Sequence, residues 1–437
     1  MNGSVELYGV LQVHAEFRGR RILLLQGPVG PFFSHLCTDL EDLNATVFKV
    51  NFNGGDATYY PDGIDYRGTL EEWPDFVRQL MRTERIDHVV LFGDQRVYHR
   101  LAVEEAKALK VSVHVFEEGY LRPNYVTLER DGVNARSNMP RSRGFYRRFA
   151  KSSVQTPRPV GHVFWFAALH AAVYACAMFL GRWHYPHYQH HRDFHPIREG
   201  VFRWGLIGGL RKLIWSFRDH GRLPKFTGAL SRQFYLVPLQ VCTDFQVRGS
   251  QFDGVEDFIG HVVKTFAKHG QKRHHLVFKH HPLDRAYRDY TGTLTKLAKE
   301  HGLEGRIHYV ADLHLPTLLQ HARGTIVLNS TVGLSSLQHG TPTCALGTAV
   351  YTLARLTFER SLGHFLRNPG KVDREAVRGF CRYLARKNQL EGSFYKRSHF
   401  PSLVGDRSLP ATQLRPARAT GSYGSAAAPA AATRWSR

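Results

Sequence analysis

Residues 87–119 read DHVVLFGDQRVYHRLAVEEAKALKVSVHVFEEG, and they contain two strand patterns with a helical pattern between them. DHVVLFGD and VSVHVFEEG are short, rich in β-branched residues and bounded by Gly or Asp. Residues 98–110, between them, have helical periodicity. This order predicts two parallel strands joined by a crossover helix, within a sheet that is covered on both faces.

The same alternation extends in both directions along the chain. RRILLLQG and ATVFKVNF predict two earlier strands, and residues 70–85 predict a helix. Alternation resumes near Gln233 with FYLVPLQV, HHLVFKHHP, RIHYVAD, GTIVLNS and PTCALG, with helices near 258–269 and 315–323. We therefore expect an α/β protein with two parallel-sheet domains that face a cleft, and ligands at the carboxyl ends of the strands.

Length and composition divide the 437 residues into four segments. We expect an N-terminal Rossmann-like domain at 1–133, a basic and aromatic helical insert at 134–230, and a C-terminal Rossmann-like domain at 231–400. Residues 409–437 are rich in Ala, Pro, Ser and Arg and predict a disordered tail.

The charge of the chain is strongly positive and unevenly distributed. Lys and Arg number 59 against 37 Asp and Glu, which gives +22, and residues 134–226 hold 16 of the former and 3 of the latter. Such a charge favours an anionic partner, which could be nucleic acid, lipid headgroups or a phosphorylated substrate. Charge alone would suit nucleic acid, but no RNP, KH or zinc-finger pattern is present, and the insert contains a long apolar run.

That apolar run is VFWFAALHAAVYACAMFLG, residues 163–181. Nineteen residues could just cross a bilayer as a helix. His170 lies in the middle of the run, however, and Trp and Arg follow it, as is typical of a helix at the headgroup boundary. Three interpretations remain open: docking on anionic lipid, a buried core helix with basic flanks, and a true span.

The cysteines and histidines give no pattern of a structural metal site. Five cysteines are scattered without C-x-x-C spacing, which fits a reducing cytoplasm, and the N-terminus has no apolar segment of a secretory signal. Histidines at 184, 187, 190, 191 and 195 have H-x-x-H spacing, which can bind a metal ion. Because no Cys or carboxylate ligand stands at a matching position, a solvated basic surface is the simpler interpretation. We expect no metal.

Paired acids follow the strand VSVHVF. Partial burial of Glu117 or Glu118 beside a like charge would raise one pKa toward the range of a general acid or base. Glu118 is the first candidate, because a residue next to Gly119 can leave the strand axis and reach the cleft. Glu117 is the second candidate. The alternative is a solvated turn.

Candidate phosphate ligands follow the strands of the second domain. Lys279, His281 and Pro282 close HHLVFKHHP and could bind an anion, although a structural His is an alternative. Asn329, Ser330 and Thr331 lie between a strand and a helix, where they could hold a phosphate or simply cap the helix.

A further pair, Gln240 and Asp244, follows FYLVPL. Asp244 would point from the first strand of the second domain into the expected cleft. The alternative for Asp244 is an Asx turn.

Several long stretches resemble one known family, in order along the chain. They are LLLQGPVGPFFSHL, VNFNGGD, LFGDQRVYHRLA, VFEEGYLRPNYVTLERDGVN, FKHHPLDR and NSTVGLSSLQHGTP, and they cover about residues 26–356. The acid-acid-Gly, His-Pro and Ser-Thr motifs resemble those of bacterial transferases of CMP-activated acidic sugars. The closer resemblance is to the KpsS/LipB-like capsule polysaccharide β-Kdo transferase family.

The resemblance implies a GT-B-like fold and a glycosyltransferase that moves Kdo from CMP-Kdo to a phosphatidylglycerol-type lipid, initiating the capsular polysaccharide linker. It implies that Asp244 of the Q-x-x-x-D element is the nucleophile of a retaining reaction and that Glu118 or Glu117 serves acid/base chemistry. The donor would be bound by the residues Gln240, Lys279, His281, Pro282, Asn329, Ser330 and Thr331.

The expected partners follow from the same resemblance. They are a CMP-sugar, an anionic phospholipid acceptor and membrane surface, and other capsule biosynthesis or export proteins, with no nucleic acid and no cofactor besides the donor substrate. The expected location is cytoplasmic and peripheral to the inner membrane. The alternative is a non-catalytic protein of capsule assembly or export that binds lipid-linked polysaccharide.

Overall fold

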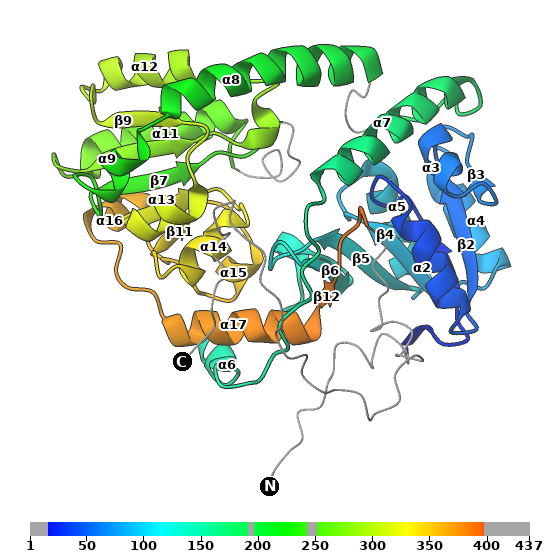
Figure 1. Cartoon of the computed structure of the whole chain (residues 1–437). Coiled ribbons are helices and arrows are strands. Elements are labelled where there is room, and N and C mark those ends of the chain that lie inside the picture. The colour runs from blue at the N-terminus through cyan, green and yellow to red at the C-terminus, as the bar shows by residue number, and fades with distance from the viewer. Residues whose placement is uncertain (1–15, 191–195, 243–250, 397–437) are drawn as a thin grey trace, which may run out of the picture. The chain divides into compact units, whose positions relative to one another are not determined.

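A computed structural model describes residues 16–190, 196–242 and 251–396, and these residues are built on two sheets (Figure 1). The first sheet has the strand order β12-β6-β5-β4-β1-β2-β3. Its strands are β1 (Arg21–Leu24), β2 (Thr46–Asn51), β3 (Ile64–Asp65), β4 (His88–Phe92), β5 (Ser112–Glu118), β6 (Tyr125–Arg130) and β12 (Gln389–Glu391). Strands β1 to β5 pair in parallel, whereas β6 and β12 are antiparallel to their neighbours.

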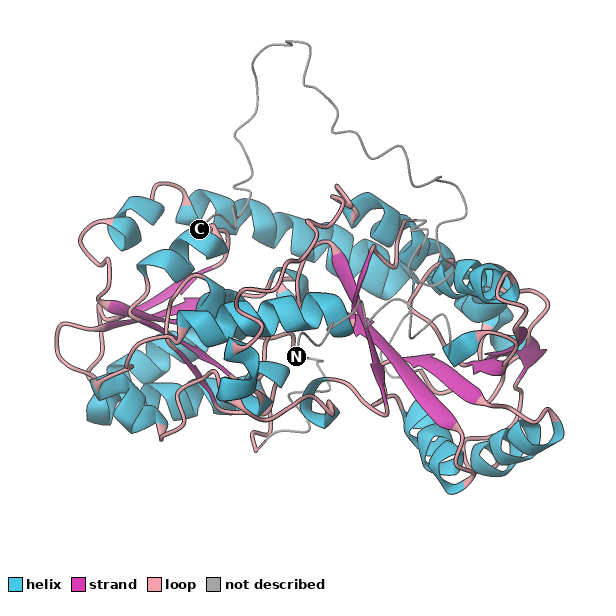
Figure 2. Ribbon diagram, turned by 90° about the horizontal axis from the view of Figure 1, so that it is seen from below, coloured by secondary structure: helices cyan, strands magenta, loops and turns pink. Residues whose placement is uncertain are grey.

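Helices cover both faces of the first sheet (Figure 2). They are α2 (Phe32–Glu41), α3 (Gly54–Tyr59), α4 (Trp73–Thr83) and α5 (Val97–Ala108). Successive residues of β5 point to opposite faces: Phe116 packs against Phe32 of α2, whereas Val115 belongs to the core cluster that contains Trp73 of α4. Because both faces are buried, the strands read as nearly continuous apolar runs.

The second sheet, β11-β10-β7-β8-β9, is parallel throughout. Its strands are β7 (Phe234–Pro238), β8 (His275–Lys279), β9 (Ile307–Val310), β10 (Gly324–Val327) and β11 (Thr343–Ala345). Its helices are α11 (Val255–His269), α12 (Thr291–Glu300), α13 (Leu315–His321), α14 (Val332–Gln338), α15 (Val350–Leu353), α16 (Leu362–Arg367) and α17 (Arg374–Lys387). The predicted α/β class with two Rossmann-type domains, the make-up of a GT-B fold, is confirmed.

The insert is helical in the part that the structure describes. It contains α6 (Arg143–Arg147), α7 (Phe164–Leu180), a π-helical stretch (Pro196–Ile207) that continues into α8 (Gly208–Asp219), and α9 (Leu223–Thr227). Helix α7 packs against α3, and Trp215 of α8 packs against His280 of the second domain. The insert therefore contacts both domains through different helices.

The chain returns to the first sheet at its end. Strand β12 pairs with β6, at Leu390 opposite Val126, and the preceding helix α17 packs against α6, where Arg147 Nη2 lies 2.6 Å from Asp373 Oδ2. The expected C-terminal domain at 231–400 thus gives its last strand to the N-terminal sheet. The tail at 409–437 lies outside the described residues.

Candidate active site

Two side chains join the carboxyl ends of β7 and β10. The strands are neighbours in the second sheet, and Gln240 and Asn329 lie two residues beyond their ends. Gln240 Nε2 donates to Asn329 Oδ1 at 2.9 Å, and the Asn329 N–H donates to Gln240 Oε1 at 3.5 Å. The structure thus brings together two residues that the sequence predicted to share this edge.

Asp284 connects the same edge to the His-Pro turn. Its side chain is fully buried in the short 3-10 turn that follows His281. Asp284 Oδ1 accepts from the Cys242 N–H at 3.1 Å, and Oδ2 accepts from the Tyr290 hydroxyl at 2.9 Å. The segment after β7 is therefore held next to the end of β8, so that three adjacent strand ends converge. Sequence analysis did not single out Asp284, although it stands within the FKHHPLDR motif.

His281 has a defined orientation in that turn. Its backbone is extended, Pro282 begins the turn, and His281 Nδ1 accepts from the Leu283 N–H at 3.1 Å. In a neutral imidazole the accepting nitrogen carries no proton, so the N–H lies on Nε2. A half-buried imidazole with this tautomer can donate one hydrogen bond to an anionic oxygen.

The two residues before His281 are turned into the protein. Lys279 Nζ donates to the carbonyl of Ala311 at 2.5 Å, and burial lowers the Lys279 pKa. His280 meets the Tyr309 hydroxyl at 2.6 Å and the ring of Trp215, and burial lowers its pKa to about 3. Lys279 is thus engaged at the end of β9 rather than with the Gln240–Asn329 pair, and His280 packs as a neutral core residue.

Ser330 and Thr331 follow Asn329 directly. Ser330 Oγ accepts from the Val332 N–H at 3.3 Å, and the Tyr351 hydroxyl donates to the Ser330 carbonyl at 2.6 Å. Helix α14 has only seven residues and no side-chain cap. The local geometry of the Ser-Thr motif is therefore set by Tyr351 and by an ordinary turn, at the edge that Asn329 and Gln240 share.

Asp244 lies outside the described residues, which end at Cys242 before this gap. The contact with Asp284 holds Cys242, the last described residue before the gap, beside the His-Pro turn. The role of Asp244 stays a prediction.

The two predicted acids at the end of β5 lie on opposite faces of the first sheet. Glu117 Oε1 accepts from the Glu118 N–H at 3.0 Å, and Oε2 accepts from Asn134 Nδ2 at 3.3 Å. Burial raises the pKa of Glu117 to about 7. Glu118 instead accepts from the Tyr395 hydroxyl at 3.4 Å. The sequence favoured Glu118 for proton transfer with Glu117 as second candidate, and the raised pKa of Glu117 now supports the second candidate.

A polar network that sequence analysis missed lies at the carboxyl ends of β1, β2 and β4. Gln26 Oε1 accepts from Arg96 Nη1 at 2.9 Å, and Gln26 Nε2 donates to Asp56 Oδ2 at 3.2 Å. Tyr174 of α7 donates to Asp56 Oδ1 at 2.8 Å and accepts from Asn53 Nδ2 at 2.9 Å. Only the tyrosine inside the apolar run could have indicated that this helix carries a polar anchor.

Helix α7 is attached to the first domain along one face. Tyr174 and Ala175 are its buried residues, and a Cβ on Gly55 would lie 2.7 Å from the Tyr174 ring. A Cβ on Gly181 would lie 2.9 Å from the Cα of Gly54. These glycines allow α3 and α7 to approach closely. The segment Phe164–Trp183 is long and apolar enough to cross a membrane, and only 11% of its most apolar stretch is buried.

One group of residues in the described ranges has the composition and spacing to hold a metal ion, away from the strand ends above. His88 Nδ1 lies 3.0 Å from His114 Nε2, and Glu16 Oε1 lies 3.6 Å from the latter atom. The Glu16 carboxylate also pairs with Arg130 at 3.4 Å, so a cation already lies beside it. Of the clustered histidines, His184 contacts Asp65 at 2.8 Å, and positions 191 and 195 lie outside the described residues.

Comparison with known proteins places the chain in a family. A family model described as capsule polysaccharide biosynthesis protein matches residues 87–395. The capsule polysaccharide export protein KpsS of Escherichia coli is 37% identical over 392 residues, which are 86% of this chain and 97% of KpsS. The capsule polysaccharide modification protein LipB of Neisseria meningitidis serogroup A is 36% identical over 402 residues, 90% of this chain and 96% of LipB.

Among solved structures, a glycosyltransferase of Rickettsia africae matches with 10% identity and a TM-score of 0.33, over 84% of this chain and 93% of that one. The family assignment rests on the sequence matches, which extend over most of the chain. The stretch that the family model matches includes Glu117, His281 and Asn329. The chain belongs to the capsule polysaccharide biosynthesis protein family.

Proposed function

We propose that the protein is a glycosyltransferase of capsule biosynthesis, which moves Kdo from CMP-Kdo to a phosphatidylglycerol-type lipid and so initiates the capsular linker. The observation that carries the proposal is the convergence of Gln240, His281 and Asn329 at three adjacent strand ends of a parallel sheet, held by the buried Asp284. Strand ends of this kind are where open α/β sheets bind ligands.

The donor phosphate would be bound by His281 with help from Ser330, Thr331 and Asn329. The Nε2–H of His281 supplies one hydrogen-bond donor to a phosphate oxygen, while Nδ1 stays engaged with the Leu283 N–H. Gln240 keeps the Asn329 side chain in place rather than contacting phosphate itself. Pro282 fixes the direction of the turn that presents His281.

The reaction we propose proceeds in two displacements with retention of configuration. An Asp244 carboxylate oxygen attacks the anomeric carbon of Kdo, a C–O bond forms, and the bond to CMP breaks with its electron pair leaving on the phosphate. The acceptor hydroxyl then attacks the same carbon from the face that CMP left. Its proton passes to a carboxylate, and the bond to Asp244 breaks, which restores the enzyme.

Glu117 is the better supported proton acceptor for the second displacement. A pKa of about 7 lets it take a proton and release it again near neutral pH. Glu118, on the other face of β5 beside Tyr395, is the second candidate. Asn134 and the Glu118 N–H orient the Glu117 carboxylate.

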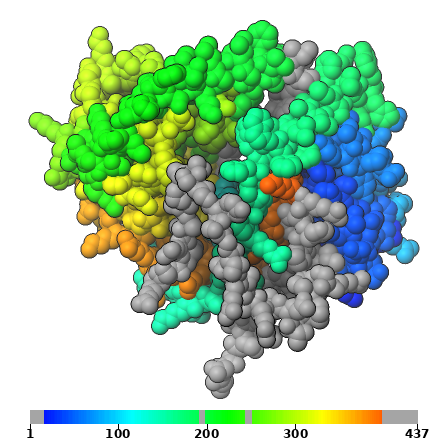
Figure 3. Space-filling model, in the orientation of Figure 1, coloured from blue at the N-terminus to red at the C-terminus, as the bar shows by residue number. Residues whose placement is uncertain are grey.

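We also propose that α7 and α8 dock the enzyme, from the cytoplasm, on the anionic inner membrane. Fifteen of the eighteen exposed large apolar side chains among the described residues lie between Phe164 and Phe217. This part of the chain, green in Figure 3, lies at the surface of the molecule. Cations such as Arg182 and Lys212 stand among them and are exposed. Because Tyr174 ties the middle of α7 to buried groups of the first domain, a spanning α7 would draw that domain into the hydrocarbon, so we favour α7 lying at the interface.

A second candidate function is supported by the name of one relative, an export protein. A protein that only binds lipid-linked polysaccharide for assembly or export would need the apolar and basic surface of α7 and α8. It would have no use for a carboxyl group with a pKa near 7 at a strand end. Other capsule biosynthesis or export proteins would be partners under either function.

The test is incubation of the whole protein with CMP-Kdo and a lysophosphatidylglycerol analogue, followed by mass spectrometry. A transferase yields the acceptor mass increased by one Kdo residue together with free CMP. The matched control is Glu117→Gln, which keeps the shape of the side chain. Unchanged acceptor mass, with the protein folded and bound to the lipid, would instead support the binding protein.

A further inference from the structure

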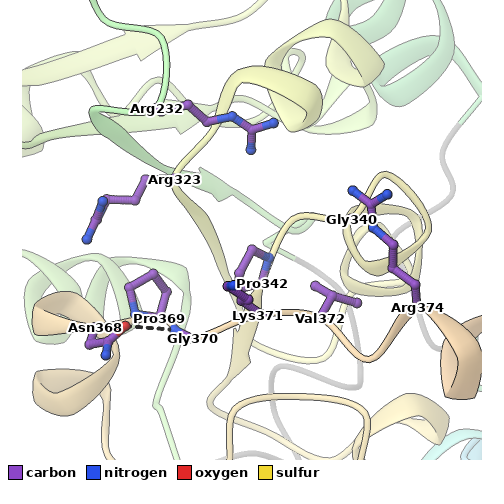
Figure 4. Close-up of a pocket in the computed structure, with 10 residues that line it drawn as sticks. All are labelled: Arg232, Arg323, Gly340, Pro342, Asn368, Pro369, Gly370, Lys371, Val372 and Arg374. Carbon is purple, nitrogen blue, oxygen red and sulfur yellow. Dashed lines mark hydrogen bonds between the residues drawn. The ribbon is translucent and has the colours of Figure 1, made fainter.

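A cationic hollow lies on the edge of the second sheet opposite the proposed donor site. It has a volume of about 490 Å³. Arg323 and Pro342 directly precede β10 and β11, and Arg232 precedes β7 by two residues, so the hollow lies at the amino ends of three adjacent strands. The remaining wall comes from residues 368–372, which follow α16, from Arg374 at the start of α17, and from Gly340 (Figure 4).

Four cations and no acid line this hollow: Arg232, Arg323, Lys371 and Arg374. Within the described residues, none of them forms an ion pair with a carboxylate. Arg232 Nη1 donates to the Ala322 carbonyl at 3.0 Å, and Arg323 Nε donates to the Tyr235 hydroxyl at 3.2 Å, which leaves further guanidinium donors on each group.

The nearest acid in the sequence is already used elsewhere. Asp373, next to Arg374, has one carboxylate oxygen 2.6 Å from Arg147 Nη2 and the other accepting from the Ala376 N–H at 3.0 Å. The charge of the hollow is therefore not neutralised from within its own wall. Positive side chains that are gathered around a concavity without counter-charges favour an anionic ligand.

Backbone features hold two of these cations in position. Gly340 has a φ of +74°, and a Cβ there would lie 2.9 Å from Arg374 Nη2, so the guanidinium lies directly over this glycine. Asn368 Oδ1 accepts from the Gly370 N–H at 3.1 Å, which shapes the turn that carries Lys371. A larger residue at 340 would displace Arg374.

We propose that this hollow is a second anion-binding site, for a ligand that carries two or more phosphate or carboxylate groups. Guanidinium groups bind such groups in bidentate geometry, and the volume suits a molecule of nucleotide size. The site is separate from the proposed donor site, because the strands β7 and β10 run from the one edge to the other. It does not depend on the proposed transferase activity.

The test is calorimetric titration of the full chain with inorganic pyrophosphate, and separately with CMP. The variant is Arg232→Gln combined with Arg374→Gln; both side chains are exposed, so the fold should be kept. We expect the variant to bind pyrophosphate at least ~10-fold more weakly, and to bind CMP as the wild type does. Arg273→Gln combined with Lys299→Gln, at exposed positions outside the hollow, removes the same charge and should bind pyrophosphate normally.

A second measurement uses the unaltered protein. Pyrophosphate should slow acetylation of Lys371 by an amine-reactive ester, without slowing that of Lys299. Equal protection of both lysines, no binding of pyrophosphate to the wild type, or equal losses of affinity in the two double variants would each overturn the proposal. A parallel loss of CMP binding in the hollow variant would show that the two edges are not separate sites.

Discussion

Glu117→Gln should make the folded protein more stable in alkaline solution while it removes activity. In the wild type, burial raises the Glu117 pKa from an ordinary 4.5 to about 7. Between these values, the unfolded chain releases the proton while the folded chain keeps it, so the free energy of unfolding falls as the pH rises. Above pH 7 the full penalty of holding a buried carboxylate is present, and glutamine does not carry it.

The size of the effect follows from the two pKa values. A pKa of about 7 against 4.5 corresponds to about 3 kcal/mol. Glu117 is half-buried, so water screens part of this penalty, and we expect a gain of about 1–3 kcal/mol for the variant at pH 8. At pH 4.5 the two proteins should differ little, because the amide oxygen of the substituted side chain can still accept from Asn134 or from the N–H of residue 118.

The assay is urea unfolding of both proteins at pH 4.5 and pH 8, with turnover measured at pH 7. Glu129, whose pKa burial also raises to about 7, is present in both proteins and cancels in the difference. Glu71→Gln, at an exposed position, controls for the loss of one negative charge. Turnover of Glu117→Gln should fall by ~10²–10⁴. The test quantity is the free energy of unfolding of Glu117→Gln minus that of the wild type. If this difference is no larger at pH 8 than at pH 4.5, the Glu117 carboxyl is not buried as described.

Three further results are expected. His281→Ala should weaken CMP binding by about 10- to 150-fold with an unchanged melting temperature, and unchanged affinity would remove His281 from the donor site. Tyr174→Phe should lower the free energy of unfolding by about 1–3 kcal/mol, because Asp56 and Asn53 lose a buried partner; an unchanged value would mean that α7 is not anchored there. Leu213→Ser combined with Phe217→Ser should weaken binding to phosphatidylglycerol vesicles at least ~10-fold, whereas Val154→Ser, exposed outside α7 and α8, should not.

Most of the buried parallel strands could be predicted from the sequence, because the pattern that marks such a strand is local. Buried parallel strands such as β4 and β5 are apolar on both faces, so they stand out as short apolar runs between helical patterns. The antiparallel strands were missed for the opposite reason. Strand β12 has three residues and pairs with β6 more than 250 positions earlier, and no local pattern encodes such a contact.

The sequence predicted which residues of the candidate site follow the ends of strands. It did not predict the directions and partners of their side chains. Gln240 and Asn329 meet as expected, because parallel neighbours end at one edge. Glu117 comes forward in the structure because burial raises its pKa to about 7, and the local sequence pattern does not encode that burial. Tyr174 bonds to Asp56 and Asp284 accepts from Cys242, and both partners are distant in sequence. Composition and local pattern do not show such contacts.

In the proposed function, CMP-Kdo binds at the carboxyl ends of the strands of the second sheet, and Asp244 attacks its anomeric carbon. The most direct test is the intact mass of the protein after mixing with CMP-Kdo in the absence of acceptor. We predict an increase by one Kdo residue, mapped to a peptide that contains Asp244 and absent from both Asp244→Asn and His281→Ala. Full transfer to the lipid acceptor by Asp244→Ala, with no covalent adduct in the wild type, would contradict the account.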